Sequence, residues 1–197
     1  MRTNYLWLIV VLLLAGCAGG PSHVEQKVSS QPPASGVEPD MSAAIDALKD
    51  GRPIVAEALL RGLVQRHPES GKPWVNIGLI YFRRGDMERA QQAAEKALEL
   101  QPDIKVADYL LGLIAHQKND APQAQKYYFA SLEKDQDHAY SHYNLALLYD
   151  TYYQDIEKAL PHYRRYLELI TEEDEETLSW VKELESQFIP AGGDDEG

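Results

Sequence analysis

The sequence predicts an all-α protein, a right-handed solenoid of about four helix-turn-helix units with a C-terminal capping helix. Three series of small or turn-forming residues recur every 34 residues along the middle of the chain. They are Ala44, Gly78, Gly112 and Ala146; Gly51, Gly85 and Asn119; and Ala56, Ala90 and Ala124. A period of this length is typical of stacked two-helix units. With 44% hydrophobic and 25% charged residues, the chain has the composition of a protein that buries a core.

The first residues predict a secretory signal peptide. Arg2 precedes an apolar run from Tyr5 to Ala15. As a helix this run would rise only about 16 Å, whereas the hydrocarbon core of a bilayer is roughly 30 Å thick. We therefore interpret residues 1–16 as a removable signal and not as a permanent membrane span.

The end of this run carries the motif Leu14-Ala15-Gly16-Cys17. It resembles the lipobox of bacterial lipoproteins, which implies acylation of Cys17 and attachment to a membrane through acyl chains. Ala18 follows the cysteine, and in lipoproteins of this kind a residue other than aspartate implies transfer to the outer membrane, facing the periplasm. The alternative is a free or buried thiol. With a single cysteine, no disulfide can form within the chain.

Residues 17–40 are rich in glycine, proline and serine and have no apolar periodicity, so we expect a flexible tether after the lipidated cysteine. The repeat domain is expected over residues 41–173. Its units should span about 37–70, 71–104, 105–138 and 139–173.

The second unit contains Trp74, Ile77-Gly78, Tyr81, Ala90, Ala97 and Pro102. This pattern resembles the tetratricopeptide repeat (TPR), whose two helices pack closely where small residues face each other. The third unit keeps Leu111-Gly112, Ala124 and Tyr128 but has Asp108 in place of the Trp. The fourth keeps Leu145-Ala146, Tyr149, Ala159 and Tyr163. It has one extra residue near Tyr152-Tyr153, in the expected turn.

The first unit matches least, since its first helix offers only Ala43, Ala44 and Ala47. After the repeats, Leu178, Val181, Leu184 and Phe188 recur at helical intervals, which predicts a capping helix over residues 174–190. The acidic run 172–176 is interpreted as the solvated start of that helix. Residues 191–197 are expected to be a disordered acidic tail.

The resemblance implies a concave groove lined by the first helix of each unit, at the second, fifth, ninth and twelfth repeat positions. The groove residues selected on this basis are Met41, Ile45, Val75, Leu79, Phe82, Tyr109, Leu113, His116, Tyr143 and Leu147. Such an apolar and aromatic stripe suits an amphipathic helix or an extended apolar segment of a partner. The alternative is that the capping helix or self-association covers part of the stripe.

The sequence contains no phosphate-binding glycine loop and no hydrolase or metalloprotease motif, so we expect no catalysis and no cofactor. His138 and His142 are four residues apart, but suitable further ligands are lacking, and we predict no metal site. The net charge of −12 disfavours nucleic acid as a partner.

The architecture favours a scaffold lipoprotein, similar to TPR lipoproteins that act as pilotins or in pilus and secretion-system assembly. An adaptor for peptidoglycan hydrolases or other cell-envelope enzymes is the alternative hypothesis, and an enzyme is a remote third.

Overall fold

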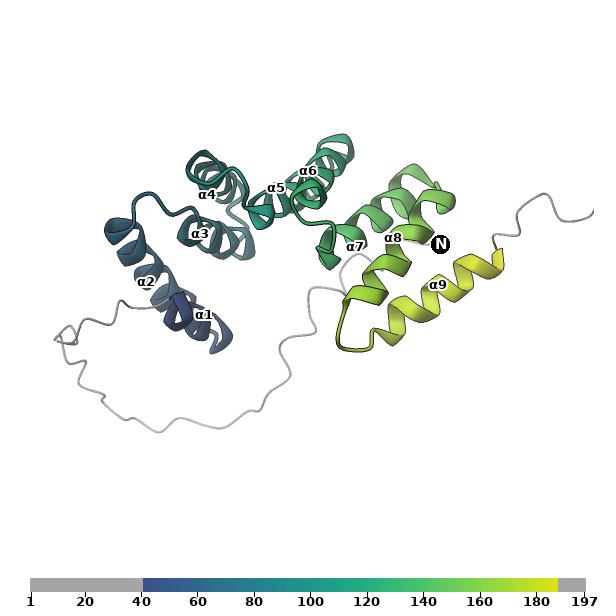
Figure 1. Ribbon diagram of the computed structural model, residues 1–197, viewed down its shortest axis with the longest axis horizontal. Coiled ribbons are helices and arrows are strands. Elements are labelled where there is room, and N and C mark those ends of the chain that lie inside the picture. Colours follow the sequence, from purple (N-terminus) through teal and green to yellow (C-terminus); the bar gives the residue numbers. More distant parts are fainter. Residues whose placement is uncertain (1–40, 188–197) are drawn as a thin grey trace, which may run out of the picture. The chain divides into compact units, whose positions relative to one another are not determined.

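The computed structural model describes residues 41–187, which form nine α-helices and one π-helical turn and contain no strand (Figure 1). This confirms the all-α repeat fold. The elements are α1 (Met41–Lys49), α2 (Pro53–Arg66), α3 (Lys72–Arg83), α4 (Met87–Leu100), α5 (Lys105–Gln117), α6 (Ala121–Lys134), α7 (Ala139–Leu148), η2 (Tyr149–Tyr153), α8 (Ile156–Leu169) and α9 (Glu175–Gln187). The predicted signal peptide, Cys17, the tether, the end of the capping helix and the tail lie outside the described residues.

The helices pack as hairpins, α1 with α2, α3 with α4, α5 with α6 and α7 with α8, and each hairpin contacts the next. Every hairpin turn has a residue with positive φ at the same place in its unit, namely Gly51, Gly85, Asn119 and Gln154. Glycine adopts this conformation without strain, and asparagine tolerates it better than most residues. The series of Gly51, Gly85 and Asn119 in the sequence therefore marks the turns.

The second helices begin with a repeated aspartate cap. Asp86, Asp120 and Asp155 each accept a hydrogen bond from the backbone N–H three residues later, at 3.1 Å. Such a cap satisfies a donor that the helix itself leaves without an acceptor. In the first unit Arg52 holds this place and makes no side-chain cap, although Pro53 at the first helical position favours the helix start.

Close helix approach explains the series of small residues. A Cβ added to Gly78 would lie 2.7 Å from Leu110 Cδ2 and 3.2 Å from the carbonyl oxygen of Ala90. A Cβ added to Gly112 would meet the ring of Tyr128, a side chain with no solvent exposure. Neither position has room for a larger side chain.

The extra residue of the fourth unit is absorbed by η2, where α7 widens into one π-helical turn before Gln154 reverses the chain. A π-turn accommodates one residue more than an α-turn. Ala159 then lies buried, as its counterparts Ala56, Ala90 and Ala124 do. The predicted place of the insertion agrees with this observation.

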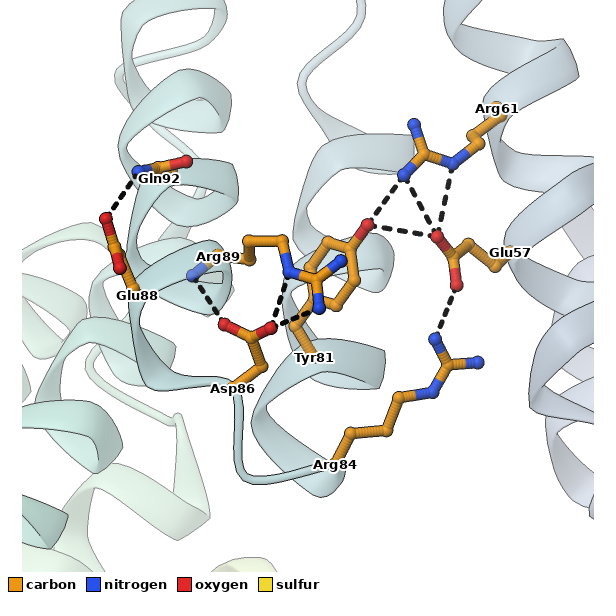
Figure 2. Close-up of polar contacts among 8 residues, drawn as sticks. All are labelled: Glu57, Arg61, Tyr81, Arg84, Asp86, Glu88, Arg89 and Gln92. Carbon is orange, nitrogen blue, oxygen red and sulfur yellow. Dashed lines mark hydrogen bonds and ion pairs between the residues drawn. The ribbon is translucent and has the colours of Figure 1, made fainter.

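The first two units are joined by a polar cluster between α2 and α3, which Figure 2 shows. Glu57 on α2 accepts hydrogen bonds from Arg61 at 3.0 Å, Tyr81 at 3.0 Å and Arg84 at 2.7 Å. Burial opposes ionisation of the carboxyl group, but these donors outweigh it and lower the pKa of Glu57. The guanidinium of Arg89 covers the Tyr81 ring, 4.6 Å from its centroid.

The helix α9 packs on α8 through Thr177, Val181 and Leu184, which are buried. Asp174 caps it by accepting hydrogen bonds from the backbone N–H and the hydroxyl of Thr177. The acidic run therefore does contain a helix start, as its composition predicts.

Candidate functional site

The first helices of successive units touch through a repeated pair of positions. The Asn76 amide of α3 contacts the sulfur of Met41 on α1 at 3.8 Å. In the same way, the Asn144 amide of α7 donates to the Tyr109 hydroxyl of α5 at 3.3 Å. Both pairs join the fifth position of one unit to the sixth of the next. Since α3 and α5 also contact each other, the first helices form a continuous surface.

The residues selected from the sequence differ in their exposure on this surface. Ile45 is 39% exposed. Eight are half-buried: Met41, Leu79, Phe82, Tyr109, Leu113, His116, Tyr143 and Leu147.

Val75 does not fit the expectation, because it is only 4% exposed and packs with Ala97 and Ala107. The small alanines on either side let the helices close over it. Val75 therefore belongs to the core and offers no side chain to a partner.

Burial shifts the pKa values of three of these half-buried residues. Burial is the main cause that raises the pKa of Tyr109 and of Tyr143 to about 12, and at Tyr109 the hydrogen bond from Asn144 opposes the shift. Burial lowers the pKa of His116. At neutral pH these three side chains are therefore uncharged.

Two further tyrosines complete an aromatic cluster that the selection from sequence missed. The ring centroid of Tyr140 lies 6.4 Å from that of Tyr109 and 6.3 Å from that of Tyr166. The Tyr166 and Tyr143 centroids are 4.9 Å apart. Tyr140 occupies the second position of its unit, a position that the resemblance implied but that did not enter the selection. Tyr166 comes from α8, so only the fold brings it to this surface.

The capping helix reaches the end of the same surface. The indole N–H of Trp180 on α9 donates to Asp150, the twelfth-position residue of the fourth unit, at 3.0 Å. Asp150 itself is not one of the selected apolar residues. Leu113 and Leu147 lie earlier on the surface and belong to none of the buried clusters of residues 41–187.

The acidic segment lines an open cavity of about 510 Å³ between the end of α8 and the start of α9. Its apolar lining comes from Leu167, Ile170 and Leu178, and the carboxylates of residues 172–175 stand around them. The cavity thus combines apolar and acidic side chains, and Lys182 also lines it.

The histidines do not form the pair considered from the sequence. His142 lies against His162 of α8, with their Nδ1 atoms 2.9 Å apart, while His138 lies 2.8 Å from the Ser141 hydroxyl. Burial is the main cause that lowers the pKa of His162 to about 4. Among residues 41–187 no three His, Cys, Asp or Glu side chains are grouped so as to hold a metal ion.

Asp108, which replaces the expected Trp in the third unit, is buried and forms an ion pair with Lys134 of α6. Burial raises the pKa of Asp108 even though Lys134 opposes the shift. At the place of the Trp, the third unit therefore has an ion pair between the helices of the same hairpin.

The fold and this surface define a class: 34-residue helix-turn-helix units, each with a small residue at its eighth position, stacked as in tetratricopeptide-repeat proteins. Residues 71–104 match the sequence profile of the tetratricopeptide repeat. The human Superkiller complex protein 3 is 34% identical to the chain over 97 residues, or 47% of this chain. These residues amount to 6% of that protein, so the chain spans only a small part of its length.

Solved structures of TPR proteins share the fold. A thermophilic TPR protein from Thermus thermophilus has a TM-score of 0.61 at 20% sequence identity, over 74% of this chain and 79% of that one. MamA from Desulfovibrio magneticus RS-1 has a TM-score of 0.56 at 22% identity, over 74% and 93% of the two chains. At this level of identity the likeness concerns the fold.

None of the helices in residues 41–187 is long and apolar enough to cross a membrane.

Proposed function

We propose that the protein is a non-catalytic scaffold that binds another protein along the first helices of its repeats. The observation that carries the proposal is a row of partly exposed aliphatic side chains, one in each unit at the ninth position: Ile45, Leu79, Leu113 and Leu147. Partly exposed apolar residues at a regular interval offer a partner segment a continuous surface to bury.

The proposal includes a lipid anchor at Cys17 that holds the scaffold at the outer membrane, facing the periplasm. The motif Leu14-Ala15-Gly16-Cys17 supports it. With residues 17–40 as a flexible tether, the repeat domain would sample roughly 25 Å around its attachment point, which is enough to meet partners without a fixed orientation.

Assembly of a pilus or of a secretion system is the role that this combination of anchor and repeats favours. An adaptor for peptidoglycan hydrolases or other envelope enzymes is the second candidate, since it would use the same surface. The identity of the captured partner separates the two roles.

The test is affinity capture of the tagged full chain from crosslinked cells, with quantitative mass spectrometry. The groove variant combines Leu113→Glu with Leu147→Glu, two residues outside the buried clusters. The control combines Ile54→Glu with Val55→Glu, exposed apolar residues of the second helix α2. Circular dichroism checks that both variants keep their helices.

We expect the groove variant to lose partners that the control retains, because a buried carboxylate without a counter-ion is strongly unfavourable. Pilus or secretion-channel subunits among the lost proteins would support the first role, and cell-wall hydrolases the second. Equal capture by both variants would refute binding at the first helices.

A further inference from the structure

The tyrosine surface, defined as Tyr109, Tyr140, Tyr143 and Tyr166, has one exposed member on a buried floor. Tyr140 is 58% exposed, whereas Tyr109 and Tyr143 are half-buried and Tyr166 is buried. With more than half of its surface exposed, the Tyr140 side chain is accessible to a partner.

The floor of the surface is held in place by its hydroxyl groups. The Tyr109 hydroxyl accepts from the Asn144 amide at 3.3 Å, and the Tyr166 hydroxyl donates to Asp174 at 2.9 Å. Rings fixed in this way lose little conformational entropy when a ligand packs on them.

Negative charge adjoins these rings. Five consecutive carboxylates, residues 172–176, begin at the end of α8, and Asp174 among them touches Tyr166. Burial is the first cause of the raised pKa of Tyr143, and the charges of Asp174 and Glu176 add to it. Negative charge therefore lies next to Tyr143 and Tyr166.

Lys105 of α5 and Lys134 of α6 do not cancel this charge, because each of the two is paired with a carboxylate. Lys105 pairs with Asp135, and Lys134 pairs with Asp108. The whole chain carries a net charge of −12, so phosphate-rich ligands and anionic lipid are repelled.

We propose that the tyrosine surface binds an arginine or lysine side chain on an extended segment of the partner protein. The inference rests on the proposed function and adds to it the chemistry of the partner. A guanidinium or ammonium group over the Tyr140 face is attracted by the π electrons and by residues 172–176. The apolar part of the same segment would lie along Leu113 and Leu147.

The experiment measures the affinity of the purified full chain, in detergent, for a fluorescein-labelled peptide of alternating leucine and arginine. The neutral control peptide carries citrulline in place of every arginine. Fluorescence anisotropy at physiological ionic strength gives both dissociation constants. Citrulline keeps the shape of the side chain and removes its charge.

The protein variants test whether the aromatic ring of Tyr140 itself contributes to binding. Tyr140→Leu removes the ring, and Tyr140→Phe retains it. Tyr152→Leu is the matched control, because Tyr152 is also 58% exposed but lies in the η2 turn. We expect Tyr140→Leu to weaken arginine-peptide binding about two- to fivefold, and the other two variants to bind as the wild type does.

A second set of variants tests the carboxylates. Glu173→Gln with Glu176→Gln should weaken the arginine peptide and leave the citrulline peptide unchanged. Glu88→Gln with Glu99→Gln removes the same charge from α4 and should have a smaller effect, since exposed charges farther than about 8 Å are screened by salt.

Equal binding of the two peptides would overturn the proposal and indicate a neutral segment as the ligand. Equal effects of Tyr140→Leu and Tyr152→Leu, or of the two carboxylate pairs, would also overturn it and indicate general charge attraction. If the groove variant with Leu113→Glu still loses its partners in these cases, the scaffold function stands without the cationic contact.

Discussion

The contact between Gly112 and Tyr128 predicts that Gly112→Ala destabilises the protein, whereas the same change at Gly62 stabilises it. The new Cβ at Gly112 would lie 2.5 Å from Tyr128 Cδ1. The Tyr128 ring is fully buried, so it cannot move aside into solvent. At Gly62 the nearest atom is the flexible end of Arg66, at 3.4 Å.

The magnitudes decide the signs. Alanine is better than glycine inside a helix by about 1 kcal/mol. Overpacking a filled core typically costs about 1–3 kcal/mol. Because Tyr128 is fully buried, we expect the cost at Gly112 to lie in the upper part of this range. The free energy of unfolding should therefore fall by about 1–2 kcal/mol for Gly112→Ala. For Gly62→Ala it should rise by roughly 0.5–1 kcal/mol.

Urea unfolding of the two variants, followed by circular dichroism, measures the difference. Adding Tyr128→Leu supplies the control, because without the ring the penalty at Gly112 should shrink. A Gly112→Ala variant as stable as Gly62→Ala would show that the helices can separate and that close approach does not determine the small residue.

Three further changes test other parts of the structure. Burial above all lowers the pKa of His138 and of His162 to about 4, so the folded state binds fewer protons than the unfolded state. Stability present above pH 6.5 should be lost as the pH falls towards 4, by roughly 1 kcal/mol per histidine by pH 5 after solvent screening, and thermal unfolding of His162→Gln should depend less on pH. Glu57→Gln should lower the free energy of unfolding by about 1–3 kcal/mol at neutral pH, since Arg61 and Arg84 lose their shared acceptor. The wild-type contribution of Glu57 should itself disappear as the pH falls below 4.5. Cys17→Ser should move the protein from the membrane fraction to the soluble fraction if acyl chains are its anchor.

Each of these measurements has a contrary outcome. An unchanged pH profile in His162→Gln would mean that other groups cause the loss of stability in acid. If Glu57→Gln unfolds at the same urea concentration as the wild type, the cluster in Figure 2 adds nothing to the joint between the first two units. A Cys17→Ser protein that still sediments with membranes would refute the anchor.

The parts of the fold that depend on local backbone needs could be predicted from sequence. Gly85 and Asn119 mark turns because few other residues accept positive φ, and Gly112 marks a close contact because nothing larger fits. Each of these requirements restricts the residue type at one position of the repeat, and that position recurs every 34 residues. A sequence alone therefore reveals them.

Contacts between helices could not be predicted as well from the sequence. Tyr140 and Tyr166 meet only because α7 and α8 pair, and the sequence pattern does not show that Lys134 lies beside Asp108. Val75 illustrates the opposite error, since its repeat position suggested the surface whereas its small neighbours bury it. The exposure of a side chain at a given repeat position depends on the size of its neighbours in other helices. The repeat pattern does not specify those neighbours.

The π-helical turn at Tyr149–Tyr153 has a consequence for how such arrays vary in length. The insertion is taken up before Asp155 caps the next helix, so the aspartate cap and the buried Ala159 of α8 match their counterparts in the shorter units. The helix packing is therefore retained although the number of residues in the unit changes. The end of the first helix, just before the turn, is accordingly a place where this fold accommodates an added residue without disturbing the helix that follows.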